Sequence, residues 1–169
     1  MKTLLLTIVV CAGLTIAGCG GSDDSSTASS ESSSTAATTS ESSGEKTKPE
    51  VSVPQGPPPK QLEIKELEKG SGAEAKAGDK VTVQYVGVDY KNGEEFDSSW
   101  SRNEPFSFTL GAGEVIPGWD QQGVEGMKVG GRRELILPPE LAYGEAGAPP
   151  AIGPNETLVF VVDLVSVRP

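Results

Sequence analysis

The sequence predicts an α+β fold, in which several antiparallel strands wrap around one short helix, behind a long N-terminal segment that does not fold. From residue 61 onward, short runs of β-forming residues alternate with turn residues. A single stretch, residues 114–131, has the start and stop signals of a helix. All aromatic side chains lie in the C-terminal half, and since aromatic rings bury the most area per residue, the first half lacks material for a core. The aromatic residues are Tyr85, Tyr90, Phe96, Trp100, Phe106, Phe108, Trp119, Tyr143 and Phe160.

The first 19 residues have the pattern of a bacterial export signal. Lys2 precedes an apolar run over residues 4–17, which suits a signal-peptide core but is short for a permanent membrane span. The run ends in IAGC at residues 16–19, which resembles a lipobox, where the thiol is acylated with fatty acids such as palmitate and the chain is cut before it. We therefore expect a lipoprotein signal peptide at residues 1–18 and a lipidated Cys19. The alternative is an ordinary secretory signal with an incidental cysteine.

The segment after Cys19 predicts a tether that extends to residue 59. Residues 20–50 are nearly all Ser, Thr, Ala, Gly and acidic residues, so they cannot bury enough surface to offset chain entropy. Residues 51–60 are rich in proline and are expected to be extended. As a flexible coil, about forty residues span roughly 35 Å root-mean-square. The globular domain, residues 60–169, would then be held near a membrane surface but not against it.

The composition excludes several function classes. The net charge of −10 argues against nucleic acid or anionic lipid headgroups as partners, because both need clustered Lys and Arg. The chain has no histidine, which removes Ser–His–Asp and Cys–His catalysis and the His-containing zinc sites. Cys11 lies in the expected signal peptide and Cys19 is the expected lipid attachment point, so the folded part has no thiol. We expect neither a metal nor a cofactor.

The strand predictions come in order along the chain. Residues 61–70 begin with the alternation of an edge strand. Residues 78–90 alternate apolar and polar side chains, and the Asn92-Gly93 pair that follows predicts a tight hairpin turn. Residues 105–111 and 132–138 alternate as well. Residues 157–167 are apolar at almost every position, as expected of a central strand that is covered on both faces.

The predicted helix lies between residues 105–111 and residues 132–138, and a long loop lies between residues 132–138 and the final strand. In residues 114–131, Pro117 suits the first turn of a helix and Gly126 could end it, which leaves one or two turns. Trp119 is among the side chains available to face inward. Residues 144–156 are rich in Gly, Ala and Pro and form a long exposed loop, where binding residues often lie.

Three motifs carry a resemblance to a known family. They are VTVQYVG at residues 81–87, FDSSWSRNEPFSFTLGAGEVIPGWDQQGVEGMKVGGRRELILPPELAYG at residues 96–144, and ETLVFVVDLV at residues 156–165. Together they resemble the FKBP-type peptidyl-prolyl cis–trans isomerases over about residues 62–167, effectively the whole globular part. The resemblance implies a five-stranded antiparallel sheet wrapped on a short helix, with a hydrophobic pocket between them. It also implies the rotamase activity of that family.

The resemblance assigns site residues position by position, with Trp119 expected at the floor of the pocket. The residues expected to act on the substrate are Tyr85, Asp97, Ile116 and Tyr143. The residues expected to bind it are Phe96, Phe106, Val115, Trp119, Ile152 and Phe160. The rim departs from the family pattern at Ala148, where eukaryotic members often have histidine, and at Ala151, a small neighbour of Ile152. These departures bear on substrate preference and macrolide affinity more than on the basic activity.

The implied reaction agrees with what the sequence lacks. Rotation about an Xaa-Pro bond faces a barrier of about 20 kcal/mol because the amide is resonance-stabilised, and no bond is broken. An apolar enclosure disfavours the charge-separated planar amide relative to the twisted one. By the resemblance, the backbone N–H of Ile116 and the hydroxyl of Tyr143 orient the substrate carbonyls. Asp97, tied to Tyr85, would lie close to the twisting amide.

We expect a monomeric isomerase that acts on proline-containing polypeptides outside the cytoplasm and assists their folding. Macrolides of the immunosuppressant type are further expected ligands, and the lipid anchor is the expected contact with the membrane. One alternative is a binding module that recognises proline segments with the same pocket without useful turnover. A weaker alternative is a holdase-like chaperone. Chaperone members of the family usually carry an inserted flap or an extra domain, and the spacing of the strands leaves no room for one.

Several residues have simpler alternative roles. Asp97 could merely stabilise the turn in which it lies. Arg102 is expected to form a structural ion pair, with Asp97 as the candidate partner. Tyr90 and Trp100 are expected at the rim or surface, and the Arg132-Arg133 pair at a solvated strand edge.

Overall fold

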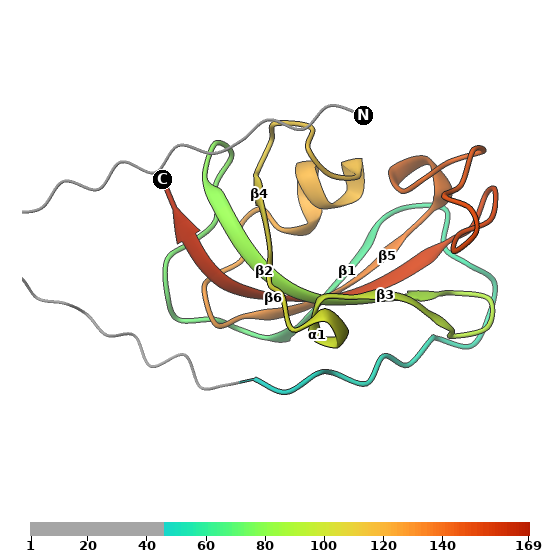
Figure 1. The fold of residues 1–169 in the computed structure, drawn as a ribbon, viewed down its shortest axis with the longest axis horizontal. Coiled ribbons are helices and arrows are strands. Elements are labelled where there is room, and N and C mark those ends of the chain that lie inside the picture. The colour runs from blue at the N-terminus through green and yellow to red at the C-terminus, as the bar shows by residue number, and fades with distance from the viewer. Residues whose placement is uncertain (1–45) are drawn as a thin grey trace, which may run out of the picture. The chain divides into compact units, whose positions relative to one another are not determined.

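The computed structural model describes residues 46–169, which form a curved antiparallel sheet with helical turns on both of its sides (Figure 1). The expected signal peptide, Cys19 and the tether up to residue 45 lie outside the described residues. None of the helices in residues 46–169 is long and apolar enough to cross a bilayer. The elements are β1 (Glu63–Glu68), β2 (Lys80–Asp89), β3 (Glu95–Ser98), α1 (Ser99–Arg102), β4 (Phe106–Thr109), η1 (Trp119–Gly123), β5 (Arg132–Leu137), η2 (Pro139–Leu141) and β6 (Leu158–Arg168).

The strand order is β1-β5-β6-β2-β3, and β4 also pairs with β2. β3 and β4 share one edge of β2, because β3 pairs with residues 86–88 and β4 with residues 80–83. The sheet therefore has the five strand positions that were predicted. The fifth position, next to β2, is occupied by two short strands, β3 and β4, with α1 between them. β6 lies in the centre and is buried on both faces over most of its length, which confirms the prediction for that segment.

The predicted short helix is present and packs on the concave face of the sheet (Figure 1). Its first turn contains Pro117, and the N–H groups of Trp119 and Asp120 donate to the carbonyl of Ile116 at 3.0 and 3.1 Å. The helix then widens into a π-turn, in which the N–H of Val124 donates to the carbonyl of Trp119. It ends at Gly123, one turn before the predicted Gly126.

Two glycines let this helix approach β5 closely. A Cβ at Gly118 would lie 1.9 Å from a methyl of Leu137, and a Cβ at Gly123 would lie 2.7 Å from a methyl of Leu135. Both distances are far below van der Waals contact, so only hydrogen fits at these positions. The close approach seats the Trp119 ring between helix and sheet, where it becomes part of the main core.

The opposite, convex face of the sheet carries a second apolar cluster, formed by Val86, Val88, Tyr90, Ile136 and Val159. The N-terminal segment covers it: Val51 and Val53 pack against the cluster, and Trp100 of α1 packs there as well. Figure 1 shows this segment running along the side of the sheet opposite to η1. Tyr90, expected at the rim or surface, is therefore buried, and its hydroxyl lies 3.4 Å from the Pro57 carbonyl oxygen.

The structure thus differs from the predicted tether over residues 46–59, which lie extended against the folded domain. The sequence prediction rested on average composition, and it missed two valines that complete a hydrophobic face. Charged groups fix the start of the segment. Lys46 and Arg132 both bond the carboxylate of Asp163, which is 2% exposed, and Arg132 also donates to the Thr47 carbonyl at 2.9 Å.

The Arg132-Arg133 pair is not the solvated strand edge that the sequence predicts. Arg133 is 8% exposed and donates to the carbonyl oxygens of Gly123 and Glu125 at 2.8 and 3.1 Å, so it caps the end of η1. Its Nη2 and Nε donate to Oε2 of Glu66 in β1 at 2.9 and 3.3 Å. Both arginines therefore connect elements, because each guanidinium has enough donors to bond several acceptors at once.

Candidate active site

A cavity of about 410 Å³ opens between η1 and the concave face of the sheet. Strands β2, β3, β4 and β6 supply one wall, and the segment that leads into η1 supplies the other. Nine of the ten residues expected at the site line this cavity. The full lining is Tyr85, Phe96, Asp97, Phe106, Glu114, Val115, Ile116, Trp119, Tyr143 and Phe160.

Trp119 lies at the centre of the aromatic lining. Its ring makes edge-to-face contacts with Tyr85 and Phe160, at centroid distances of 5.1 and 5.2 Å. Phe96 packs edge-on against Phe160 at 5.5 Å, and Phe106 lies 6.5 Å from Trp119. These are the preferred geometries for aromatic pairs, so the rings hold one another in place. The result is a rigid apolar enclosure that suits a flat, uncharged ring.

Gly87 makes room for two of these rings. A Cβ on Gly87 would lie 2.6 Å from Cζ of Phe96 and 2.8 Å from Cε1 of Phe160. Carbon atoms in contact are normally about 3.5–4.0 Å apart, so any side chain here would displace both rings. The shape of the cavity therefore depends on the absence of a side chain at this position of β2.

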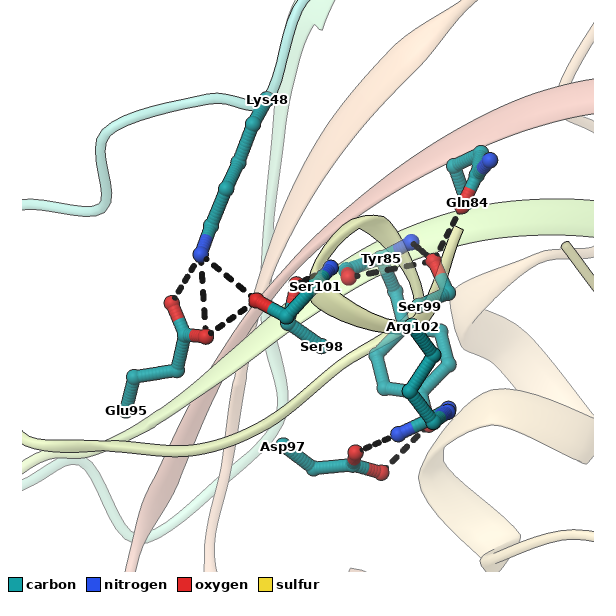
Figure 2. Close-up of polar contacts among 9 residues, drawn as sticks. All are labelled: Lys48, Gln84, Tyr85, Glu95, Asp97, Ser98, Ser99, Ser101 and Arg102. Atoms are coloured by element: carbon teal, nitrogen blue, oxygen red, sulfur yellow. Dashed lines mark hydrogen bonds and ion pairs between the residues drawn. The ribbon is translucent and has the colours of Figure 1, made fainter. Parts of the chain in front are cut away.

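A polar network lies beside the apolar enclosure (Figure 2). The Tyr85 hydroxyl donates to Oδ2 of Asp97 at 2.5 Å and accepts from Nη2 of Arg102 at 2.9 Å. Arg102 also pairs with Oδ1 of Asp97, and its guanidinium lies 5.7 Å from the centroid of the Tyr85 ring. Burial, together with the bond to Asp97, raises the pKa of Tyr85 to about 12, so the phenol stays protonated and donates.

The backbone of Tyr85 is fixed by Ser99 in the first turn of α1. The N–H of Tyr85 donates to Oγ of Ser99 at 2.8 Å, and Ser99 in turn bonds the side chain of Gln84. Ser99 is fully buried, so these bonds are shielded from water. In Figure 2 these contacts lie to the right of α1, and the bonds of Asp97 and Arg102 lie below it. α1, which the sequence did not predict, therefore carries part of the site.

Two hydrogen-bond donors at the cavity are free. Within residues 46–169, neither the backbone N–H of Ile116 nor the hydroxyl of Tyr143 bonds to another protein group. Tyr143 is 40% exposed, and its partial burial together with the charge of Asp97 raises its pKa. It is therefore a neutral donor at physiological pH. Both residues line the cavity, and each carries a donor for a carbonyl oxygen.

The comparisons with known proteins agree with this geometry. The family model for FKBP-type peptidyl-prolyl cis-trans isomerases matches residues 72–165, more than half of the chain. The chain belongs to this family. It is an enzyme of the peptidyl-prolyl cis–trans isomerase type, and nine of the residues that the family resemblance indicated share one cavity.

Relatives and solved structures of the family resemble the chain closely. An FK506-binding protein from Streptomyces anulatus is 60% identical over 121 residues, which cover 71% of this chain and 97% of the relative. A probable FK506-binding protein from Corynebacterium glutamicum is 50% identical over 119 residues, covering 70% and 98%. The crystal structure of FkpA from Escherichia coli matches with a TM-score of 0.58 and 48% identity, covering 64% of this chain and 48% of that one. The match to the Streptomyces protein must start near residue 50 or earlier, so it includes part of the segment that covers the convex face.

One residue expected at the site of this FKBP-type isomerase does not line the cavity. Ile152 is 4% exposed and packs in the main core. The backbone groups of Ile152 and Ala148 bond each other at 2.9 and 3.0 Å, which closes a tight turn in the loop and directs the isoleucine inward. The sequence reasoning instead missed Glu114, which lines the cavity and accepts from the N–H of Thr109 at 2.8 Å. Its position directly before Val115 was the available signal.

Within residues 46–169, no three Asp, Glu, His or Cys side chains are grouped so that they could hold a metal ion.

Proposed function

We propose that the protein catalyses cis–trans isomerisation of Xaa-Pro bonds in proteins outside the cytoplasm and thereby assists their folding. The observation that carries the proposal is the aromatic cavity with two free donors at its edge. A proline ring is flat and apolar, and the carbonyls on either side of it need donors. The cavity offers both.

The apolar wall supplies the main catalytic effect. Planar amides have charge separated between oxygen and nitrogen, and this separation is lost when the bond is twisted. Transfer into a water-poor enclosure of Phe96, Trp119 and Phe160 therefore destabilises the planar amide more than the twisted one. Rate enhancement follows without covalent chemistry.

The polar groups orient the substrate. The N–H of Ile116 and the hydroxyl of Tyr143 each donate to a substrate carbonyl, which holds the chain while the bond rotates. Both oxygens of Asp97 are occupied, one by Tyr85 and one by Arg102. Asp97 therefore acts as a fixed charge that faces the twisting amide, and not as a proton acceptor.

The test is the rate of cis–trans exchange of a short Xaa-Pro peptide, measured by NMR with the full chain at micromolar concentration. We expect catalysis, and a loss of about tenfold or more in kcat/KM when Asp97→Ala and Tyr143→Ala are combined. Tyr90→Phe is the matched control, because its hydroxyl lies on the convex face next to Pro57. No catalysis would leave proline binding without turnover as the function, and a double variant with full activity would refute the site.

We also propose that Cys19 is lipidated and anchors the protein at the outer face of a membrane. The support is the sequence of residues 1–19, with its apolar run and its IAGC ending. Replacement Cys19→Ala should release the protein from the membrane fraction, and Cys11→Ala serves as the control because that cysteine lies within the expected signal peptide. If the Cys19 variant stays in the membrane fraction, lipidation at this position is excluded.

Macrolides are the second ligand class that we propose. The relatives from Streptomyces anulatus and Corynebacterium glutamicum are named for FK506 binding, and the aromatic cavity suits a bulky apolar ring system. FK506 should inhibit the isomerase competitively. Catalysis that persists at saturating FK506 would show that the macrolide does not reach the cavity.

A further inference from the structure

Residues 46–53, here called the strap, cross the convex face of the sheet and reach the segment that carries one side of the active site. Nζ of Lys48 lies 2.7 Å from Oε2 of Glu95 and 3.0 Å from Oγ of Ser101. Oγ of Ser101 also donates to Oε1 of Glu95 at 3.1 Å, so the three side chains form a closed triangle (Figure 2). Glu95 begins β3 and Ser101 lies in α1.

The two residues that Lys48 joins bracket the active-site side chains of this segment. Phe96 and Asp97, which both line the cavity, lie between Glu95 and Ser101 in the chain, and Arg102 follows directly. The close-up shows the Lys48 contacts to the left of α1 and the contacts of Asp97 and Arg102 below it (Figure 2). Any shift of β3 relative to α1 would therefore move the wall and the polar network of the cavity together.

The backbone pairing of this segment is short. β3 has four residues and pairs with β2 through three residue pairs, with a break in register between Gly87 and Val88. α1 is a single turn. Short elements of this kind have low local stability, so an outside contact has a large effect on their position.

The strap itself is well fixed on both sides of Lys48. Before it, Lys46 bonds the buried Asp163 at 3.1 Å and the Thr47 carbonyl accepts from Arg132 at 2.9 Å. After it, Val51 and Val53 pack into the convex apolar cluster. Because the backbone is held at both ends, the ammonium group of Lys48 is presented to β3 and α1 at a defined point.

We propose that the strap is part of the catalytic unit and that Lys48 is a positioning residue, which holds β3 and α1 so that Phe96, Asp97 and Arg102 keep their catalytic arrangement. The inference rests on the proposed isomerase function. It moves the start of the functional domain from residue 60 to residue 46. Lys48 does not touch the substrate and acts through Glu95 and Ser101.

The test compares three variants of the full chain in the peptide exchange assay. Lys48→Ala should lower kcat by at least about threefold with little change in KM, because the cavity remains but its polar network loses its alignment. Lys48→Arg should restore kcat to within about twofold, since a guanidinium can reach the same acceptors. Lys65→Ala is the matched control: Lys65 is an exposed lysine of β1 whose nearest acid, Glu134, lies 4.0 Å away.

A second readout reports on the network itself. The phenol titration of Tyr85, followed by NMR of labelled tyrosine, should shift in Lys48→Ala, because Asp97, which raises the pKa of Tyr85, and Arg102, which lowers it, both lose their alignment. The titration should be unchanged in Lys65→Ala. The thermal midpoint of Lys48→Ala should stay within about 2 °C of the unmodified protein, because an exposed ion pair contributes little to stability.

The outcomes separate the strap from the proposed function. If the unmodified protein is inactive, the isomerase proposal fails, while the Tyr85 titration still tests the strap. If the protein is active and Lys48→Ala matches Lys65→Ala in both readouts, the strap has no positioning role. An activity loss that follows the unfolded fraction and is not restored by Lys48→Arg would likewise overturn the inference.

Discussion

Replacement Gly87→Ala places one methyl group at the point where two rings of the cavity meet. The added Cβ would lie 2.6 Å from Cζ of Phe96 and 2.8 Å from Cε1 of Phe160. Since carbon atoms need about 3.5 Å, both rings must move by about 1 Å. Neither can move far without losing contacts, because Phe96 and Phe160 pack edge to face at 5.5 Å and Phe160 packs against Trp119 at 5.2 Å.

The size of the effect follows from these contacts. Overpacking of a dense core by one methyl group costs about 1–3 kcal/mol, so the free energy of unfolding should fall by that amount. The effect on catalysis should be larger, because a displacement of about 1 Å at a site that works by shape can cost up to about 100-fold in rate. We expect kcat/KM for an Xaa-Pro peptide to fall by at least about tenfold.

Exchange NMR measures the rate and urea unfolding measures the stability of the same variant. Gly153→Ala is the matched control, because the atoms nearest to its added Cβ belong to the carboxylate of Glu156, the far end of a flexible side chain. It should keep most of the activity. If Gly87→Ala retains full kcat/KM and full stability, the cavity tolerates displaced rings and the shape-based account of catalysis is wrong.

Four further predictions concern the polar network, the buried charges and the strap. Tyr85→Phe should lower kcat/KM by about threefold to tenfold, because Asp97 loses a donor. The pKa of Tyr85 is raised to about 12 in the folded protein, above the unfolded value of 10.0. The contribution of this shift to stability is therefore complete below pH 10 and is lost as the pH rises towards 12. Between pH 9 and 11, the free energy of unfolding should fall by about 1 kcal/mol more in the unmodified protein than in Tyr85→Phe. Asp163→Ala should lower the free energy of unfolding by about 3 kcal/mol in urea titrations, because Arg132 would be left without its buried partner; a change below about 1 kcal/mol would contradict this. Val53→Ser should cost about 1–2 kcal/mol by exposing part of the convex cluster, whereas a neutral result would mean that the strap adds no burial.

Periodicity and turn chemistry were sufficient to predict the sheet. The alternation of residues 78–90, the Asn92-Gly93 turn and the unbroken apolar run of residues 157–167 each predicted an element that the structure contains. Gly93 has φ of 72°, the left-handed conformation that such a turn requires. These signals are local, so they can be read without knowledge of the rest of the chain.

The grouping of nine expected residues around one cavity could be predicted because they lie in long motifs with fixed spacing. Ile152 was the exception, because a hydrophobic residue in a loop can face the cavity or the core, and the Ala148–Ile152 turn decides between them only in three dimensions. α1 was missed for a related reason. Its four residues are too few for a periodic pattern, and its stability comes from burial of Ser99 and Trp100 and not from helix propensity.

The strap could not be predicted from composition. Its neighbours in sequence are polar and proline-rich, and its stability comes from contacts with residues more than thirty positions away, such as Val86 and Val159. Composition measures whether a segment can form its own core. It does not measure whether the segment can complete the core of another part of the chain.

The most direct test of the central claim is to map where an Xaa-Pro peptide binds while its isomerisation is being catalysed. Amide NMR spectra of the labelled protein would be recorded with increasing peptide, together with the exchange between the cis and trans peptide signals. We expect catalysed exchange, and shift changes concentrated at Tyr85, Phe96, Ile116, Trp119 and Tyr143. Shift changes confined to the convex face around Val53 and Tyr90, or binding without exchange, would contradict the assignment of the aromatic cavity as the catalytic site.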